Sequence, residues 1–139
     1  YPSGGCLFVK KVADSMKIGT HGSTFAGSPL AMRLANAVLD IMLKPGFDKH
    51  ILEVSKYFFD QLNKIKNKFP KIIKEIRGKG LIIGLQFFED PSKFSTAFQK
   101  NKLLTVKASD NVIRILPPLN VQKEEIDEGI DIINKTLKQ

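Results

Sequence analysis

Two adjacent hydroxyl side chains, Ser23 and Thr24, lie in a glycine-rich stretch that runs from Gly19 to Ser28 and is followed by Pro29. Glycine lets a main chain approach an anion closely, and the hydroxyls and backbone N–H groups of such a loop can donate hydrogen bonds to a phosphate. The same residue types also make ordinary turns that bind nothing. From these residues alone, an unliganded turn is at least as well supported as a phosphate-binding loop.

Arg114 is the second residue whose type suggests chemistry. It lies in the apolar stretch Val112–Leu116, where a buried guanidinium would be costly without an anionic partner. Arginine suits a carboxylate because its planar fork can donate two parallel hydrogen bonds. The alternative is a half-buried strand in which Ile113 and Ile115 face the core and Arg114 faces water. The pattern alone favours that alternative.

The remaining reactive side chains predict structural roles. Arg77 follows a predicted strand and could pair with Glu75 or with an acidic residue of another domain. His21 has no acid or nucleophile nearby in the sequence, and His50 fits the surface of a helix. Cys6 lies in an apolar run, which favours a buried and inert thiol. Two histidines and one cysteine at no ligand spacing predict no metal site.

Composition predicts one soluble, globular core. The chain has 139 residues, of which 42% are hydrophobic and 26% charged. It contains no apolar run of the ~20 residues that a bilayer span needs and no signal-peptide pattern. A single cysteine favours a cytoplasmic location. The net charge of +8 arises mainly between Lys44 and Gly80, but without interleaved aromatic residues or a known motif it does not predict nucleic-acid binding.

Hydrophobic periodicity and turn residues predict the order of elements. Ser28 should cap a helix whose first residue is Pro29 and which is buried on several sides, and Asn120 should cap the last helix. The expected strands are 4–9, 72–77, 81–88, 103–106 and 112–116, and the expected helices are 29–43, 48–68, 93–100 and 121–137. The sum is an α/β chain of the α+β type, with a small, mostly antiparallel sheet and helices on one face.

Four segments carry a resemblance to a known family. The stretch Gly19–Ala31 resembles the G-T-H-x-S-T-F-G-G-N-P-L-A signature of class-III, pyridoxal-phosphate-dependent aminotransferases, with Ala26 and Ser28 in place of the usual Gly and Asn. Three further segments agree in order, namely 36–40, 77–84 and 110–120. Within the class, the likeness is greatest to the acetylornithine and ornithine aminotransferases, and it covers nearly the whole chain.

The resemblance implies that this chain is the C-terminal third of such an enzyme. Tyr1–Gly5 is similar to a segment that follows the lysine on which the family holds its cofactor as a Schiff base. That lysine would lie upstream of residue 1, so no catalytic residue is assigned within the chain. Residues 1–28 would be the end of the large cofactor-binding domain, and residues 29–139 would be the small C-terminal domain with the inter-domain helix.

The resemblance also implies an activity. The full-length enzyme would use pyridoxal 5'-phosphate to move the terminal amino group of N-acetylornithine to 2-oxoglutarate in arginine biosynthesis, as a cytoplasmic homodimer. Ser23 and Thr24 would contact a cofactor phosphate held mainly by the other subunit, and Arg114 would bind the substrate's α-carboxylate. Two alternatives stay open: a non-catalytic remnant or interaction module, and another class-III aminotransferase acting on ornithine, succinylornithine or 4-aminobutyrate.

Overall fold

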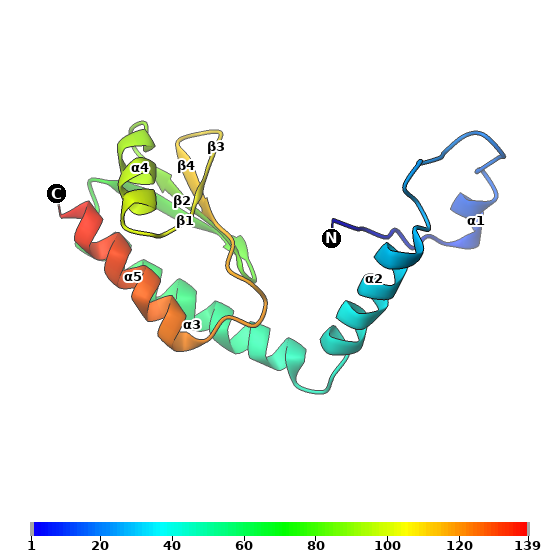
Figure 1. Ribbon diagram of the computed structural model, residues 1–139. Coiled ribbons are helices and arrows are strands. Elements are labelled where there is room, and N and C mark those ends of the chain that lie inside the picture. The colour runs from blue at the N-terminus through cyan, green and yellow to red at the C-terminus, as the bar shows by residue number, and fades with distance from the viewer. Residues whose placement is uncertain (1, 139) are drawn as a thin grey trace. The chain divides into compact units, whose positions relative to one another are not determined.

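A computed structural model describes residues 2–138, which divide into two compact units, with the boundary in the chain between Phe47 and Asp48 (Figure 1). The first unit holds two helices and the glycine-rich loop, and the second holds the sheet and three helices. The elements are, in order, α1 (Lys10–Ala13), α2 (Pro29–Met42), α3 (Phe47–Lys68), β1 (Ile73–Lys79), β2 (Ile82–Phe87), α4 (Ser92–Lys100), β3 (Val106–Ala108), β4 (Val112–Ile115) and α5 (Lys123–Leu137).

The first unit contains no strand among its described residues. The predicted strand Gly4–Val9 is wrong, because these residues pair with no other strand and lead directly into the short helix α1. A strand needs a neighbour to satisfy its backbone N–H and C=O groups, and this unit supplies none. Helix α2 begins at Pro29 as predicted. Ser28 occupies the N-cap position, although its side chain makes no capping hydrogen bond.

Helix α2 is rich in apolar residues but is largely exposed. The burial predicted for it on several sides is wrong for this chain, because Ala31 is its one buried residue and Leu30 is 63% exposed. Cys6, expected to be buried, is also exposed. Both corrections have one cause: the first unit is too short to build a hydrophobic core of its own.

The second unit is built on a four-stranded antiparallel sheet with the strand order β1-β2-β4-β3. Gly84 in the middle of β2 lies opposite Arg77 of β1 on one side and opposite Arg114 of β4 on the other. The hairpin between β3 and β4 turns through Asp110 and Asn111, both at positive φ. Asp and Asn tolerate that backbone region better than other residues do, which explains the hairpin predicted here.

One face of the sheet carries the core of this unit. Alternate residues of β2 and β4 are buried with the apolar sides of α3, α4 and α5. Phe87 and Phe94 stack with ring centroids 5.2 Å apart. The least exposed core side chains are Leu62, Ile73, Ile83, Leu85, Phe98, Ile113 and Ile133. The α/β fold class, with a four-stranded antiparallel sheet and helices, is therefore as the sequence predicts.

Two boundaries differ from the prediction. Asn120 does not cap the last helix. Gln122 is the N-cap residue, and its backbone N–H donates to the Glu125 carboxylate over 2.8 Å. The third strand is Val106–Ala108 rather than 103–106, since Leu103 turns back to pack against the core. Among residues 2–138, no helix combines the length and the apolar character that crossing a membrane requires.

Candidate functional site

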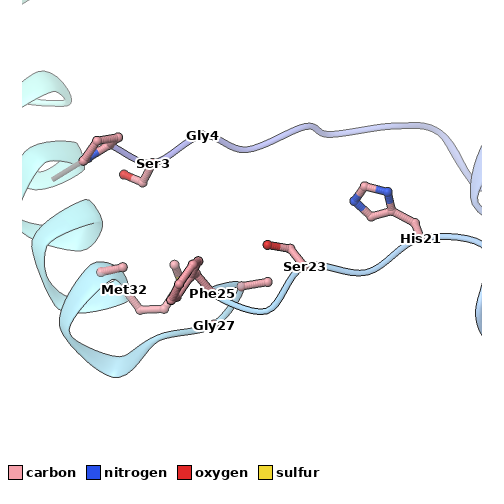
Figure 2. A pocket seen from close by; sticks show the side chains of 10 residues that line it. Ser3, Gly4, His21, Ser23, Phe25, Gly27 and Met32 are labelled. Atoms are coloured by element: carbon pink, nitrogen blue, oxygen red, sulfur yellow. The ribbon is translucent and has the colours of Figure 1, made fainter.

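The glycine-rich loop of the first unit borders an open hollow of about 600 Å³. Figure 2 shows the side chains of His21 and Ser23 on the side of the loop that faces Ser3 and Gly4, with Phe25 and Met32 nearer to α2. The full lining is Pro2, Ser3, Gly4, His21, Ser23, Phe25, Ala26, Gly27, Ala31 and Met32. Short polar side chains and glycine backbone thus meet at the N-terminal end of α2.

Two glycines allow the loop to take this path. Gly19 has φ +85° and Gly27 has φ +71°, a region that strains other residues. Between them, the Ala26 N–H donates to the Ser23 carbonyl over 3.2 Å, which closes a turn. Ala26 and Ser28, which depart from the family signature, are not at positive φ. Both replacements are therefore compatible with the loop geometry.

The two predicted cofactor-binding residues are placed differently. Ser23 lines the hollow, whereas Thr24 does not, although both side chains are exposed. A phosphate fits the hydroxyl of Ser23, the glycine backbone and the first N–H groups of α2, which no side chain caps. No lysine and no carboxylate line the hollow within residues 2–138. The described residues thus suit the phosphate end of pyridoxal phosphate, but they offer no amine or pyridine partner.

Arg114 lies on the sheet face opposite the core. Its neighbours Ile113 and Ile115 are buried, while Arg114 is exposed, so the strand alternates as the simpler interpretation of the sequence predicts. No ion pair of Arg114 is found within residues 2–138. The guanidinium is therefore available to an anion. Its role as a carboxylate-binding residue stays a prediction.

Tertiary contacts show the partners of two other polar side chains, Arg77 and His50. Arg77 approaches Asp110, at 4.0 Å between Nη2 and Oδ2, rather than Glu75. His50 lies on α3 and places Nε2 at 3.1 Å from the backbone carbonyl of Val121, so it is partly buried and not simply a surface residue. No periodicity could have revealed this contact, which joins residues 71 positions apart. No cluster of potential metal ligands occurs in the described part of the chain.

The side chains with a shifted pKa lie in the second unit. The hydrogen bond from Lys107 lowers the pKa of Asp90, and Ser92 adds to the effect. The hydrogen bond to Asp127 raises the pKa of the Tyr57 hydroxyl. The first pair joins the loop before α4 to β3, and the second joins α3 to α5. We infer that both pairs stabilise the fold of the second unit.

Comparison with known proteins defines the class. The family description "Aminotransferase class-III" matches residues 1–137, so the chain belongs to the class-III aminotransferase family. It is 42% identical over 130 residues to acetylornithine aminotransferase 1 of Bradyrhizobium diazoefficiens. The aligned region covers 94% of this chain and 32% of that protein. It is 36% identical over 138 residues to the mitochondrial acetylornithine aminotransferase of Yarrowia lipolytica. The aligned region covers 99% of this chain and 34% of that protein.

Solved structures show the same relationship. Acetylornithine aminotransferase from Elizabethkingia anophelis matches 91% of this chain and 34% of its own, at 32% identity and a TM-score of 0.76. Ornithine aminotransferase from Toxoplasma gondii matches 91% of this chain and 31% of its own, at 32% identity and a TM-score of 0.79. The chain thus spans about a third of the length of the relatives it matches. The segment Tyr1–Gly5 falls within the family match, although Tyr1 lies outside the described residues.

Proposed function

We propose that this chain provides the C-terminal third of an aminotransferase that moves the terminal amino group of N-acetylornithine to 2-oxoglutarate, giving N-acetylglutamate semialdehyde and glutamate. The observation that carries the proposal is the match of nearly the whole chain to proteins named acetylornithine aminotransferase, at 36–42% identity in the two relatives above. We further propose that the assembled enzyme is a cytoplasmic homodimer of arginine biosynthesis, although one of these relatives is named mitochondrial.

Pyridoxal 5'-phosphate, when bound, supplies the electron sink for amino-group transfer. The residues of this chain would bind and orient the cofactor and the substrate. Ser23 donates a hydrogen bond to the phosphate from the hollow, Thr24 contributes from the same loop, and Arg114 binds the carboxylate of the substrate through its planar fork. On this proposal residues 1–28 belong to the large domain, and residues 29–139 form the small domain with α2 as its inter-domain helix.

The alternative is an interaction module without catalysis. The exposed apolar surface of α2, with Leu30, Val38 and Ile41 at 63%, 53% and 51% exposure, favours a chain that is completed by contacts to other protein. Ornithine, succinylornithine and 4-aminobutyrate are the other amino donors to test, and the likeness to an ornithine aminotransferase supports the first of them.

A chimera tests the proposal. This chain replaces the matching C-terminal third of the Bradyrhizobium diazoefficiens relative, and glutamate formation from 2-oxoglutarate is measured with each of the four amino donors. We expect activity with N-acetylornithine in the chimera and none in this chain alone, because no lysine lines the hollow. A chimera that folds and retains the cofactor absorbance but transfers no amino group would favour the interaction module. Preference for another donor would reassign the substrate.

A further inference from the structure

A second pocket, of about 140 Å³, lies in the second unit beside the loop that joins β2 to α4. Its lining comes from the turn before β1, from the end of β2 with the following loop, and from the first turn of α4. The apolar side chains that line this β2–α4 pocket are Ile72, Phe87, Phe88 and Phe94. A cavity of about 150 Å³ accommodates benzene. The β2–α4 pocket is therefore of a size and lining that suit one flat apolar group.

Contacts within the second unit hold the apolar lining in place. The Phe88 N–H donates to the Ile72 carbonyl over 3.2 Å, which ties the loop to the turn before β1. Phe87 is 2% exposed and stacks on Phe94. Phe88, in contrast, is 54% exposed. A ligand ring can therefore pack on Phe88 at a lining that is already ordered, which lowers the entropic cost of binding.

The same pocket is lined by four charged side chains, which are Lys71, Glu89, Asp90 and Lys93. Asp90 already has a partner, since the Lys107 ammonium lies 2.6 Å from its carboxylate. The other three form no ion pair within residues 2–138. The Lys93 ammonium lies 4.9 Å from the centre of the Phe94 ring, and this attraction keeps it beside the aromatic lining. Two ammonium groups and one carboxylate are thus available to a ligand.

We propose that the β2–α4 pocket binds an α-amino acid with an aromatic side chain. The ring packs against Phe88 and the apolar lining, Lys71 and Lys93 bind the α-carboxylate, and Glu89 binds the α-ammonium group. Each available charge of the lining then faces a charge of opposite sign, and the ring covers apolar surface that water otherwise contacts. The proposed function assigns no role to these residues, so either proposal can fail without the other.

The test is an NMR titration of the whole chain with L-phenylalanine, followed at the backbone amides of Phe88 and Phe94. Two analogues are titrated at the same ionic strength: 3-phenylpropionate lacks the ammonium group, and phenethylamine lacks the carboxylate. We expect a dissociation constant of about 1–5 mM for phenylalanine, as the usual affinity per ligand atom predicts. 3-Phenylpropionate should bind about threefold more weakly because it loses one exposed charge contact, and phenethylamine about tenfold more weakly because it loses two.

Single substitutions should change the three affinities in different ways. Glu89→Gln should weaken phenylalanine and phenethylamine binding by about threefold without weakening 3-phenylpropionate binding. Lys93→Gln should weaken phenylalanine and 3-phenylpropionate binding by about threefold without weakening phenethylamine binding. Phe88→Ala removes the exposed ring and should weaken binding of all three ligands by about fivefold.

Lys100→Gln is the matched control for net charge. Lys100 lies on the same helix as Lys93 and is exposed, but it does not line the pocket. Its replacement should change each affinity by less than about 1.5-fold, because solvent and salt screen a distant exposed charge. Glu89 and Lys93 are exposed as well, and cross-strand amide contacts between β1 and β2 establish that each variant is folded.

Saturable shifts confined to the amides around the pocket, with the expected order of the three ligands, support the site. Equal affinities for the three ligands, tighter binding of 3-phenylpropionate than of phenylalanine, or no saturation with phenylalanine would overturn it. An effect of Lys93→Gln no larger than that of Lys100→Gln would also overturn it, because the charge would then act without a local contact.

Discussion

The hydroxyl of Tyr57 on α3 donates a hydrogen bond of 2.6 Å to the carboxylate of Asp127 on α5. The bond joins residues 70 positions apart and links the two long helices that cover the sheet. Lys123 places its ammonium 5.5 Å from the centre of the same ring. A single tyrosine therefore connects α3 to two residues of α5, which gives this helix pair a measurable dependence on pH.

Stability should fall when Tyr57 ionises. Hydrogen bonding to Asp127, partial desolvation and the charge of Asp127 raise its pKa above the ordinary value of 10.0. A raised folded-state pKa contributes stability that is present below pH 10 and is lost as the pH rises through the folded value. The melting temperature of the wild type should exceed that of Tyr57→Phe by a constant margin between pH 7 and 9, and the margin should shrink above about pH 10. A margin independent of pH would contradict this assignment.

The opposite dependence is expected for Asp90. Lys107 places its ammonium 2.6 Å from the Asp90 carboxylate, and together with Ser92 it lowers the pKa of Asp90 below 3.8. A lowered pKa contributes stability that is present above the unfolded value and is lost as the pH falls through the folded one. The melting temperature of Lys107→Gln should therefore be lower than that of the wild type at pH 6, and the two should be equal at about pH 2. Equal melting temperatures at pH 6 would show that the pair of Lys107 and Asp90 does not stabilise the fold.

Gly78, near the end of β1, and Gly80, in the turn between β1 and β2, form a matched pair of substitutions. Gly78 has φ +148°, and an added Cβ would lie 2.1 Å from the backbone oxygen of Ile82, whereas Gly80 has φ +59° and no atom within 4 Å of the added Cβ. Gly78→Ala should cost at least about 3 kcal/mol in the free energy of unfolding, since the backbone must move. Gly80→Ala should cost about 1–2 kcal/mol from conformation alone. Urea unfolding measures both, and equal losses would contradict the close approach at Gly78.

Arg114→Lys tests the proposed carboxylate contact in the chimeric enzyme. Lysine keeps the charge but loses the planar fork, so carboxylate substrates should bind more weakly by about 1.5–3 kcal/mol, the range for a hydrogen bond to a charged group. Steady-state kinetics of both half-reactions provide the measurement. Unchanged KM and kcat would refute the role of Arg114.

Ser23 and Thr24 give a comparison within the loop. Ser23 lines the hollow and Thr24 does not, so Ser23→Ala in the chimera should weaken cofactor retention by about 1.5–3 kcal/mol, and Thr24→Ala by less. Cofactor retention after dialysis is measured beside the melting temperature, which should change little because both side chains are exposed. A larger loss in Thr24→Ala would indicate that Thr24 contacts the phosphate from another subunit. A mixed dimer, in which one subunit carries Thr24→Ala and its partner lacks the cofactor lysine, then shows which subunit supplies the contact.

The sequence by itself determined the α/β class, the order of the elements and the family. Helix α3 and strands β2 and β4 were predictable because their apolar residues repeat at the period of the element and turn residues bound them. The loop at Ser23 and the segment around Arg114 were found because their residue order resembles a family signature. These are local properties that neighbouring residues specify.

Tertiary structure alone decided burial, pairing and the exposed face. Arg77, Gly84 and Arg114 come together through the strand order β1-β2-β4-β3, which no local pattern encodes. The pairing of Arg77 with Asp110 and the contact of His50 with Val121 depend on the same long-range packing. Apolar patterning predicted burial for α2 and a strand at Gly4–Val9, but a pattern records only that a surface needs a partner. Whether the chain contains that partner depends on residues distant in sequence, and within this chain most of the α2 surface stays exposed.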